Sequence, residues 1–161
     1  MLWPREPTPD LWIGDGGTNA AFVAAGEAVV MRPGVRQFAV DVWSRRRGVE
    51  PADRAAAGWA CTRFSCAPGE ADGSPLAMWW GRRAPSLEQV DALCRSATVV
   101  SVRARVAVLP ASCKGRLVLD GTDYARGGAV ELWRDGSASA GRWRAVWAAD
   151  VRGDRPWSRP G

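Results

Sequence analysis

The chain contains no histidine among its 161 residues, and this absence excludes the commonest hydrolytic sites. Catalytic zinc usually rests on histidine ligands, and Ser-His and Cys-His dyads need an imidazole base. We therefore expect no catalytic residue, no metal ligand and no bound cofactor.

Long apolar runs are also missing. No stretch approaches the roughly 18–20 apolar residues that span a bilayer. Residues 1–6 lack the charged-then-apolar layout of a signal peptide. We expect the chain by itself to be soluble, with neither a membrane span nor an export signal.

With 47% hydrophobic residues, including 10 tryptophans, the chain can build a substantial core. Its length fits one domain comfortably. Residues 1–9 are rich in proline and are interpreted as a lead-in. We expect one globular domain over residues 10–157, followed by a tail over residues 158–161. No internal repeat is visible.

Lysine is nearly absent as well. Lys114 is the only lysine among 22 basic residues, the formal net charge is +5 and the pI is about 9.7. Arginine forks suit phosphate oxygens, so one explanation is a phosphate-contacting surface. The other explanation is a GC-rich genome, because its codons favour Arg, Ala, Gly and Trp over Lys. The composition of the chain favours this second explanation.

Some arginines cluster or alternate with tryptophan, as a platform for single-stranded nucleic acid would require. The candidate nucleic-acid contacts are Arg45, Arg46, Arg47, Arg82, Arg83, Arg142 and Arg144. The structural alternative is that tryptophan faces the core while arginine faces solvent, and we favour it. Arginines 45–47 also have a local role, because cations complement the carboxyl end of a helix dipole.

Four cysteines, Cys61, Cys66, Cys94 and Cys113, allow three pairings. Their spacings, C-x4-C and C-x18-C, differ from the closely paired ligands of structural zinc sites. Two disulfides in an oxidising compartment account for the even number, and the sequential pairing closes two separate loops. Four separate buried thiols are the alternative.

Alternating and valine-rich runs predict strands at 11–13, 20–24, 27–31, 59–66, 76–80, 98–102, 106–109, 116–119, 129–134 and 142–147. Residues 49–58 are interpreted as a loop or a loose helical turn. We also expect Thr122 to cap a single helical turn through Arg126.

Two main helices interrupt the strands. The first ends at Gly48, and its apolar face consists of Val35, Phe38, Ala39, Val42 and Trp43. The second follows Pro85 with a capping box of Ser86 and Gln89. Its apolar face consists of Leu87, Val90, Leu93, Cys94 and Ala97. The pattern predicts an α/β or α+β domain with a mixed sheet and two main helices.

Two further motifs have simple structural explanations. The run Gly14-Asp15-Gly16-Gly17 lacks the spacing of a phosphate-binding loop and is interpreted as a turn. Asp15 and Asp120 both follow predicted strands and could form a carboxylate pair. Because such pairs catalyse hydrolysis, a small carboxylate-dependent hydrolase is a less favoured alternative.

The order of several motifs resembles one known family. These are the segments 9–16 and 36–43, the four cysteines, the strand 117–120, the run Gly127-Gly128-Ala129 and the closing segment 153–157. Together they resemble the C-terminal soluble region of the ComEC family of DNA-internalisation competence proteins, in its alphaproteobacterial form. The resemblance covers roughly residues 9–157.

The resemblance implies a degenerate domain similar to metallo-β-lactamases, on an inner-membrane protein that carries single-stranded DNA into the cell. Family members with a working site carry an H-x-H-x-D-H motif, which this chain lacks. The resemblance therefore implies a non-catalytic accessory domain at the periplasmic face of the inner membrane. Its partners would be the membrane channel and, through arginines, single-stranded DNA, with no small-molecule substrate. A disulfide-stapled exported binding module unrelated to DNA is the alternative.

Overall fold

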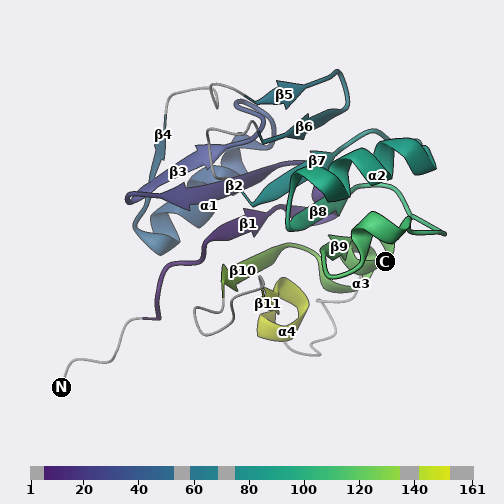
Figure 1. The fold of residues 1–161 in the computed structure, drawn as a ribbon. Coiled ribbons are helices and arrows are strands. Elements are labelled where there is room, and N and C mark those ends of the chain that lie inside the picture. The colour runs from purple at the N-terminus through teal and green to yellow at the C-terminus, as the bar shows by residue number, and fades with distance from the viewer. Residues whose placement is uncertain (1–5, 53–58, 69–74, 135–141, 153–161) are drawn as a thin grey trace.

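The computed structural model describes residues 6–52, 59–68, 75–134 and 142–152. In these residues the chain forms two mixed sheets and four α-helices (Figure 1). The predicted combination of strands with two main helices is confirmed, although there are two sheets rather than one. No helix in these ranges is long and apolar enough to cross a bilayer.

The first sheet collects strands from both ends of the chain. Its order is β11 (Trp143–Trp147), β10 (Val130–Arg134), β1 (Leu11–Ile13), β2 (Ala20–Ala24), β3 (Glu27–Val30) and β4 (Glu50–Ala52). All neighbours are antiparallel except β3 and β4, which are parallel because helix α1 (Gln37–Arg47) connects them.

The second sheet is built from the middle of the chain. Its order is β5 (Ala60–Cys61), β6 (Ser65–Ala67), β7 (Leu76–Trp79), β8 (Val99–Val102) and β9 (Leu117–Leu119). Strands β7, β8 and β9 are parallel, and helix α2 (Leu87–Ser96) connects the first two. Parallel strands place their carboxyl ends at one edge, which here carries the candidate site.

Short helical elements complete the chain. These are the 3-10 turns η1 (Asp15–Gly17) and η2 (Ala111–Cys113) and the helices α3 (Gly121–Gly127) and α4 (Ala148–Arg152). Asp120, rather than Thr122, caps α3. Its carboxylate accepts from the N–H groups of Thr122 and Asp123 in a capping box, which satisfies donors that a helix start leaves free.

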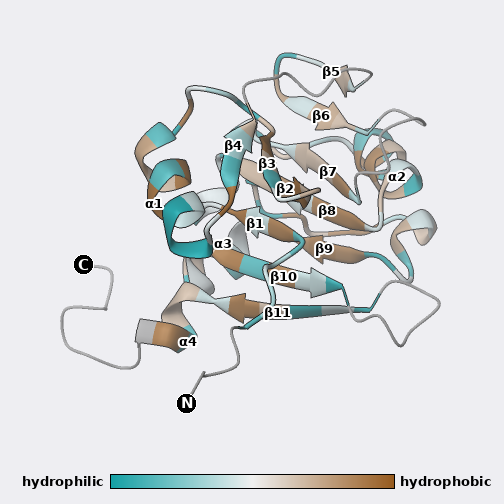
Figure 2. Ribbon diagram, turned by 90° about the vertical axis from the view of Figure 1, so that its left-hand side faces the viewer, coloured by the Kyte–Doolittle hydropathy of each residue, from teal (hydrophilic) through white to brown (hydrophobic). Residues whose placement is uncertain are grey.

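The sheets pack face to face and each carries a helix outside, so the order of layers is helix, sheet, sheet, helix (Figure 2). Period-two alternation explains the arrangement: Leu11 and Ile13 of β1 enter the core between the sheets, while Trp12 faces α1. On β8, Val99 enters the same core and Val100 faces α2.

One polar pair lies inside this core. Ser101 of β8 and Tyr124 of α3 hydrogen-bond to each other through their hydroxyl groups. Burial raises the pKa of the Tyr124 hydroxyl far above its usual range, so it stays neutral and serves only as a hydrogen-bonding group.

The first helix ends at Arg47 before Gly48 as predicted, but it begins at Gln37, after Val35, and of the predicted apolar face within it only Trp43 is buried. Val40, Trp43 and Ser44 point inward, whereas Phe38 is 82% exposed and Val42 is 48% exposed. Trp43 determines the orientation because it stacks on Trp12. The prediction that Phe38, Ala39 and Val42 lie on the buried face is therefore wrong. The same holds for Leu87, which is exposed on α2.

Three strand predictions need correction. Residues 59–66 form a hairpin of β5 and β6 rather than one strand, because the turn between them is closed by Thr62 and Ser65. Residues 106–109 form no strand, since the Val106 N–H donates to the Asp120 carboxylate instead of a neighbouring strand. Residues 50–52, expected in a loop, form the edge strand β4.

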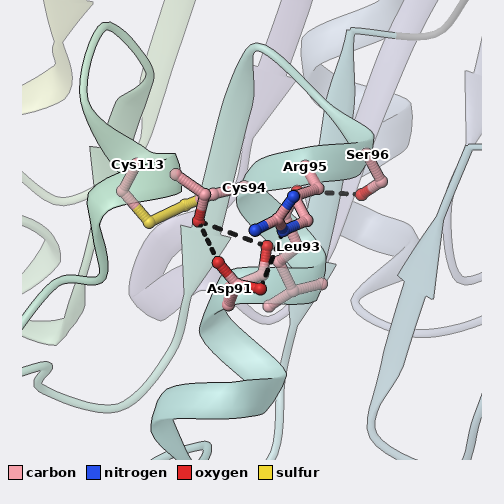
Figure 3. The surroundings of a disulfide bond; sticks show 7 residues. Asp91, Leu93, Cys94, Arg95, Ser96 and Cys113 are labelled. Atoms are coloured by element: carbon pink, nitrogen blue, oxygen red, sulfur yellow. Dashed lines mark hydrogen bonds and ion pairs between the residues drawn. A yellow bond between two sulfur atoms is a disulfide. The ribbon is translucent and has the colours of Figure 1, made fainter.

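The cysteines pair sequentially, and the described part of the chain contains no free thiol. The Cys94–Cys113 disulfide joins α2 to η2 (Figure 3). Beside it, the Ser112 hydroxyl and then the Arg95 guanidinium hold the pKa of Asp91 below its ordinary value. The disulfide and the Ser112–Asp91 hydrogen bond thus join α2 to η2.

An ion pair fastens α1 to the first sheet. Arg47 donates from Nε and Nη2 to the Glu131 carboxylate at 2.6 and 2.7 Å, and each side chain is 13% exposed. The Trp43 indole donates to the same carboxylate at 3.1 Å. Burial raises the pKa of Glu131, but the hydrogen bonds from Arg47 and Trp43 outweigh it and leave this pKa below its ordinary value.

We predict that Glu131→Gln lowers the free energy of unfolding at neutral pH by about 1–3 kcal/mol. The largely buried Arg47 charge would then keep, among the described residues, only the longer contact with the Glu6 carboxylate at 3.5 Å. Because the folded-state pKa of Glu131 is depressed, the contribution is full above the ordinary pKa of glutamate. It is lost as the pH falls through the lower folded-state value. Urea unfolding across the acidic pH range measures both effects.

Arg95→Met is the control, because it removes an exposed ion pair within α2 and is expected to change stability little. Equal stability of the Glu131→Gln variant and the native chain at neutral pH would contradict the role given to this ion pair.

Candidate functional site

A groove with a volume of ≈ 750 Å³ opens at the carboxyl ends of the parallel strands β7 and β8. Ligands of open sheets with parallel strands commonly bind at this edge. Arginine and aromatic side chains dominate the lining, which includes Arg32, Arg63, Phe64, Trp79, Trp80, Arg82, Arg83, Gln89 and Arg103.

Two consecutive tryptophans at the end of β7 organise the groove. The Trp79 indole donates to the Arg83 carbonyl at 3.0 Å, and the Trp80 indole donates to the Arg63 carbonyl at 3.1 Å. Gly81 makes this possible, since a Cβ there would lie 2.9 Å from Trp79 Nε1. The rings are therefore half-buried supports for the loops as well as parts of the groove wall.

The turn of the β5–β6 hairpin forms the opposite wall. Trp80 donates its backbone N–H to the Phe64 carbonyl at 2.8 Å, which joins the turn to the end of β7. The Phe64 ring lies 6.2 Å from the Trp79 ring and is 44% exposed. Phe64 is thus the aromatic side chain of the groove that is most open to a stacking ligand.

Arg32 reaches the groove from the first sheet. Its guanidinium lies 4.4 Å from the centre of the Trp80 ring and donates to the Thr18 carbonyl at 2.6 Å. The fully buried Asn19 side chain fixes the backbone there: it donates to the carbonyls of Arg32 and Val35 and accepts from the N–H of Arg32. One amide therefore determines where this arginine emerges.

The groove holds positive charge without neighbouring carboxylates. Five arginines line it, and within the described ranges none of them forms an ion pair with a carboxylate. Burial and then the positive charge of Arg103 lower the pKa of Arg32. By contrast, the hydrogen bond to Glu131 raises the pKa of Arg47. An anion in the groove would supply the missing negative charge.

The chemistry of the lining suits binding. Guanidinium groups offer forked donors for phosphate or carboxylate oxygens, and aromatic rings offer faces for stacking. Among the described residues, the lining includes no carboxylate, hydroxyl, thiol or amine that could serve as a general base or a nucleophile.

The predicted nucleic-acid contacts fall on three separate surfaces. Arg82 and Arg83 lie in the groove, where both are exposed. Arg45 and Arg46 are exposed at the end of α1, and Arg47 is held by Glu131. Figures 1 and 2 show α1 and α2 on opposite sides of the two sheets.

Arg142 and Arg144 belong to the third surface, around the edge strand β11. Arg142 is exposed, while Arg144 lies 4.2 Å from the Trp133 ring and forms an ion pair with Glu6 at 3.7 Å. Figures 1 and 2 both place β11 at the far end of the molecule from the β5–β6 hairpin. Only Arg82 and Arg83 of the seven predicted arginines line the groove.

Sequence reasoning missed four residues of the groove, namely Arg32, Arg63, Phe64 and Arg103. One signal could have found two of them: Arg63 and Phe64 stand between the closely spaced Cys61 and Cys66, where a disulfide closes a short loop. Arg32 and Arg103 follow strands and have no local signature.

The carboxylates singled out in the sequence have structural roles. Asp120 caps α3 and also accepts from the Val106 N–H, and Asp15 begins the turn η1. Across the described ranges, no group of three or more histidine, cysteine, aspartate or glutamate side chains could hold a metal ion.

Comparisons with protein families, with curated proteins and with solved structures found no match for this chain. The function is therefore inferred from the groove and from the motifs of the sequence.

We predict that Arg103→Gln leaves the free energy of unfolding unchanged or raises it by up to about 0.5 kcal/mol at low ionic strength, because it removes repulsion from Arg32. The same change should reduce the rise in melting temperature that tripolyphosphate produces in the native chain. Urea unfolding and thermal denaturation with and without tripolyphosphate measure the two effects. A clear loss of stability together with an unchanged response to tripolyphosphate would contradict the charge assignment.

Proposed function

We propose that this chain is a non-catalytic accessory domain of a ComEC-like DNA-uptake membrane protein, and that its groove contacts single-stranded DNA. The observation that carries the proposal is the groove itself, at the carboxyl edge of parallel strands. There, five arginines without a carboxylate partner among the described residues surround an exposed aromatic ring.

Single-stranded nucleic acid matches both parts of this lining. Its phosphates suit the guanidinium groups, and its unstacked bases can reach an aromatic face such as that of Phe64. Bases in a duplex are stacked on each other and offer no such face. The groove therefore favours a single strand over a duplex.

Two further observations support the DNA-uptake context. The ordered motifs that resemble the ComEC C-terminal region run through most of the chain. Two disulfides also suit an oxidising compartment, as expected for a domain at the periplasmic face of the inner membrane. In this proposal the channel-forming part of the same system is the protein partner.

The two disulfides also suit a second candidate function that does not involve DNA uptake. A disulfide-stapled exported binding module would use the same groove for an anion other than DNA. The two candidates differ in their ligands. The module would bind tripolyphosphate as well as it binds an oligonucleotide with equal charge, whereas a DNA-contacting domain gains affinity from stacked bases.

We predict that the native chain binds a fluorescent oligothymidylate at low salt, with an affinity that falls steeply as salt rises. The double change Arg82→Gln and Arg83→Gln should weaken binding about tenfold. It should also reduce the slope of log K against log salt by about 1.4, or about 0.7 per lost phosphate contact. Fluorescence anisotropy over a salt series measures both quantities.

The double change Arg45→Gln and Arg46→Gln is the matched control, because it removes the same charge from α1 on the other side of the sheets. Its effect should be small. No binding at low ionic strength, or equal losses in the two double variants, would refute DNA contact through the groove.

A further inference from the structure

The Cys61–Cys66 disulfide closes the turn that builds one wall of the groove. The two cysteines face each other directly across β5 and β6, and only residues 62–65 lie between them. Those residues include Arg63 and Phe64, which supply one of the groove's cations and its most exposed aromatic ring. The disulfide therefore belongs to the binding loop.

The outer strand of this hairpin is weakly held in the described part of the chain. Strand β5 has two residues, both exposed, and it pairs only with β6 at the edge of the sheet. A short edge hairpin with little apolar burial has low local stability. The other restraints are the pairing of β6 with β7, the hydrogen bonds between Thr62 and Ser65, and the two hydrogen bonds from Trp80 to the carbonyls of Arg63 and Phe64. The disulfide is the covalent restraint on the turn, and it adds to these hydrogen bonds.

The two disulfides differ in their access to solvent. Cys61 is exposed and its partner Cys66 is buried, whereas both Cys94 and Cys113 are buried between α2 and η2 (Figure 3). Thiol–disulfide exchange requires an incoming thiolate to reach a sulfur atom in line with the disulfide bond. A reductant in solution will therefore open Cys61–Cys66 before Cys94–Cys113.

We propose that Cys61–Cys66 is a redox clamp on the groove: its reduction releases the turn that carries Arg63 and Phe64 and weakens anion binding, while the domain stays folded. A dithiol is the reductant. Its first thiolate attacks Cys61 Sγ and expels the Cys66 thiolate. Its second thiolate then displaces Cys61, which leaves two cysteine thiols and the oxidised, cyclic dithiol after transfer of two electrons.

The part of this inference that concerns DNA binding rests on the proposed function, whereas the release of the turn does not. The test therefore has two readouts. In the first, dithiothreitol is titrated, mass mapping identifies the opened disulfide, and oligothymidylate binding is measured at each stage. Protein with Cys61–Cys66 reduced and Cys94–Cys113 intact should bind about tenfold more weakly, the loss expected for one phosphate contact and one stacked ring.

The variant with Cys61→Ser and Cys66→Ser should bind like the selectively reduced protein and should not respond to mild reduction. Thr62→Ala is a second variant: it keeps the disulfide and removes the hydroxyl that accepts from the Phe64 N–H in the turn. It should retain most of the affinity, because the covalent link still holds the turn.

Hydrogen exchange of the oxidised and the selectively reduced protein is the second readout and needs no ligand. Reduction should speed exchange of the Trp80 amide, which donates to the Phe64 carbonyl, and leave the amides of α2 unchanged. Unchanged exchange at Trp80, opening of Cys94–Cys113 first, or DNA binding by the double serine variant at the native affinity would overturn the clamp. If the oxidised chain binds no DNA but exchange at Trp80 still speeds on reduction, the DNA proposal fails and the clamp stands.

Discussion

The buried amide of Asn19 is the interaction on which the groove depends. Both of its donors and both acceptor positions of its oxygen are used, by the carbonyls of Arg32 and Val35 and by the N–H groups of Ala20 and Arg32. A buried amide stabilises a protein when all of its donors and acceptors form hydrogen bonds. Because Asn19 joins the start of β2 to the segment after β3, Arg32 leaves the first sheet in one direction, towards Trp80 of the second.

The arginines fall into two classes according to their surroundings, although they are identical in the sequence. Arg47 is compensated by Glu131 and stabilises the packing of α1, so its charge is not available to a ligand. Arg32 and Arg103 repel each other, and no carboxylate of the described residues forms an ion pair with either of them. Uncompensated charge of one sign beside aromatic rings is typical of a binding surface, because the ligand completes the electrostatics.

The sequence predicted an element correctly where one local signal, such as a helix cap or a run of alternating residues, dominates. The capping box of Ser86 and Gln89 starts α2, Gly48 ends α1, and the apolar alternation of residues 11–13 forms β1. The errors came where a distant contact overrides the pattern. Trp43 packs on Trp12 and donates to Glu131, and this orientation of α1 leaves Phe38 in solvent. The spacing of residues 35–43 alone predicts that Phe38 is buried together with Trp43.

The sequence by itself determined the mixed strand and helix content, the absence of histidine chemistry and the excess of arginine, since composition and short-range periodicity are properties of the chain alone. Only the tertiary structure decided which arginines share a site. Arg32, Arg63, Arg82 and Arg103 come from four loops of two sheets, and they meet because parallel β7 and β8 bring their carboxyl ends to one edge. No local pattern encodes that meeting, because it results from strand order and from the packing of one sheet on the other.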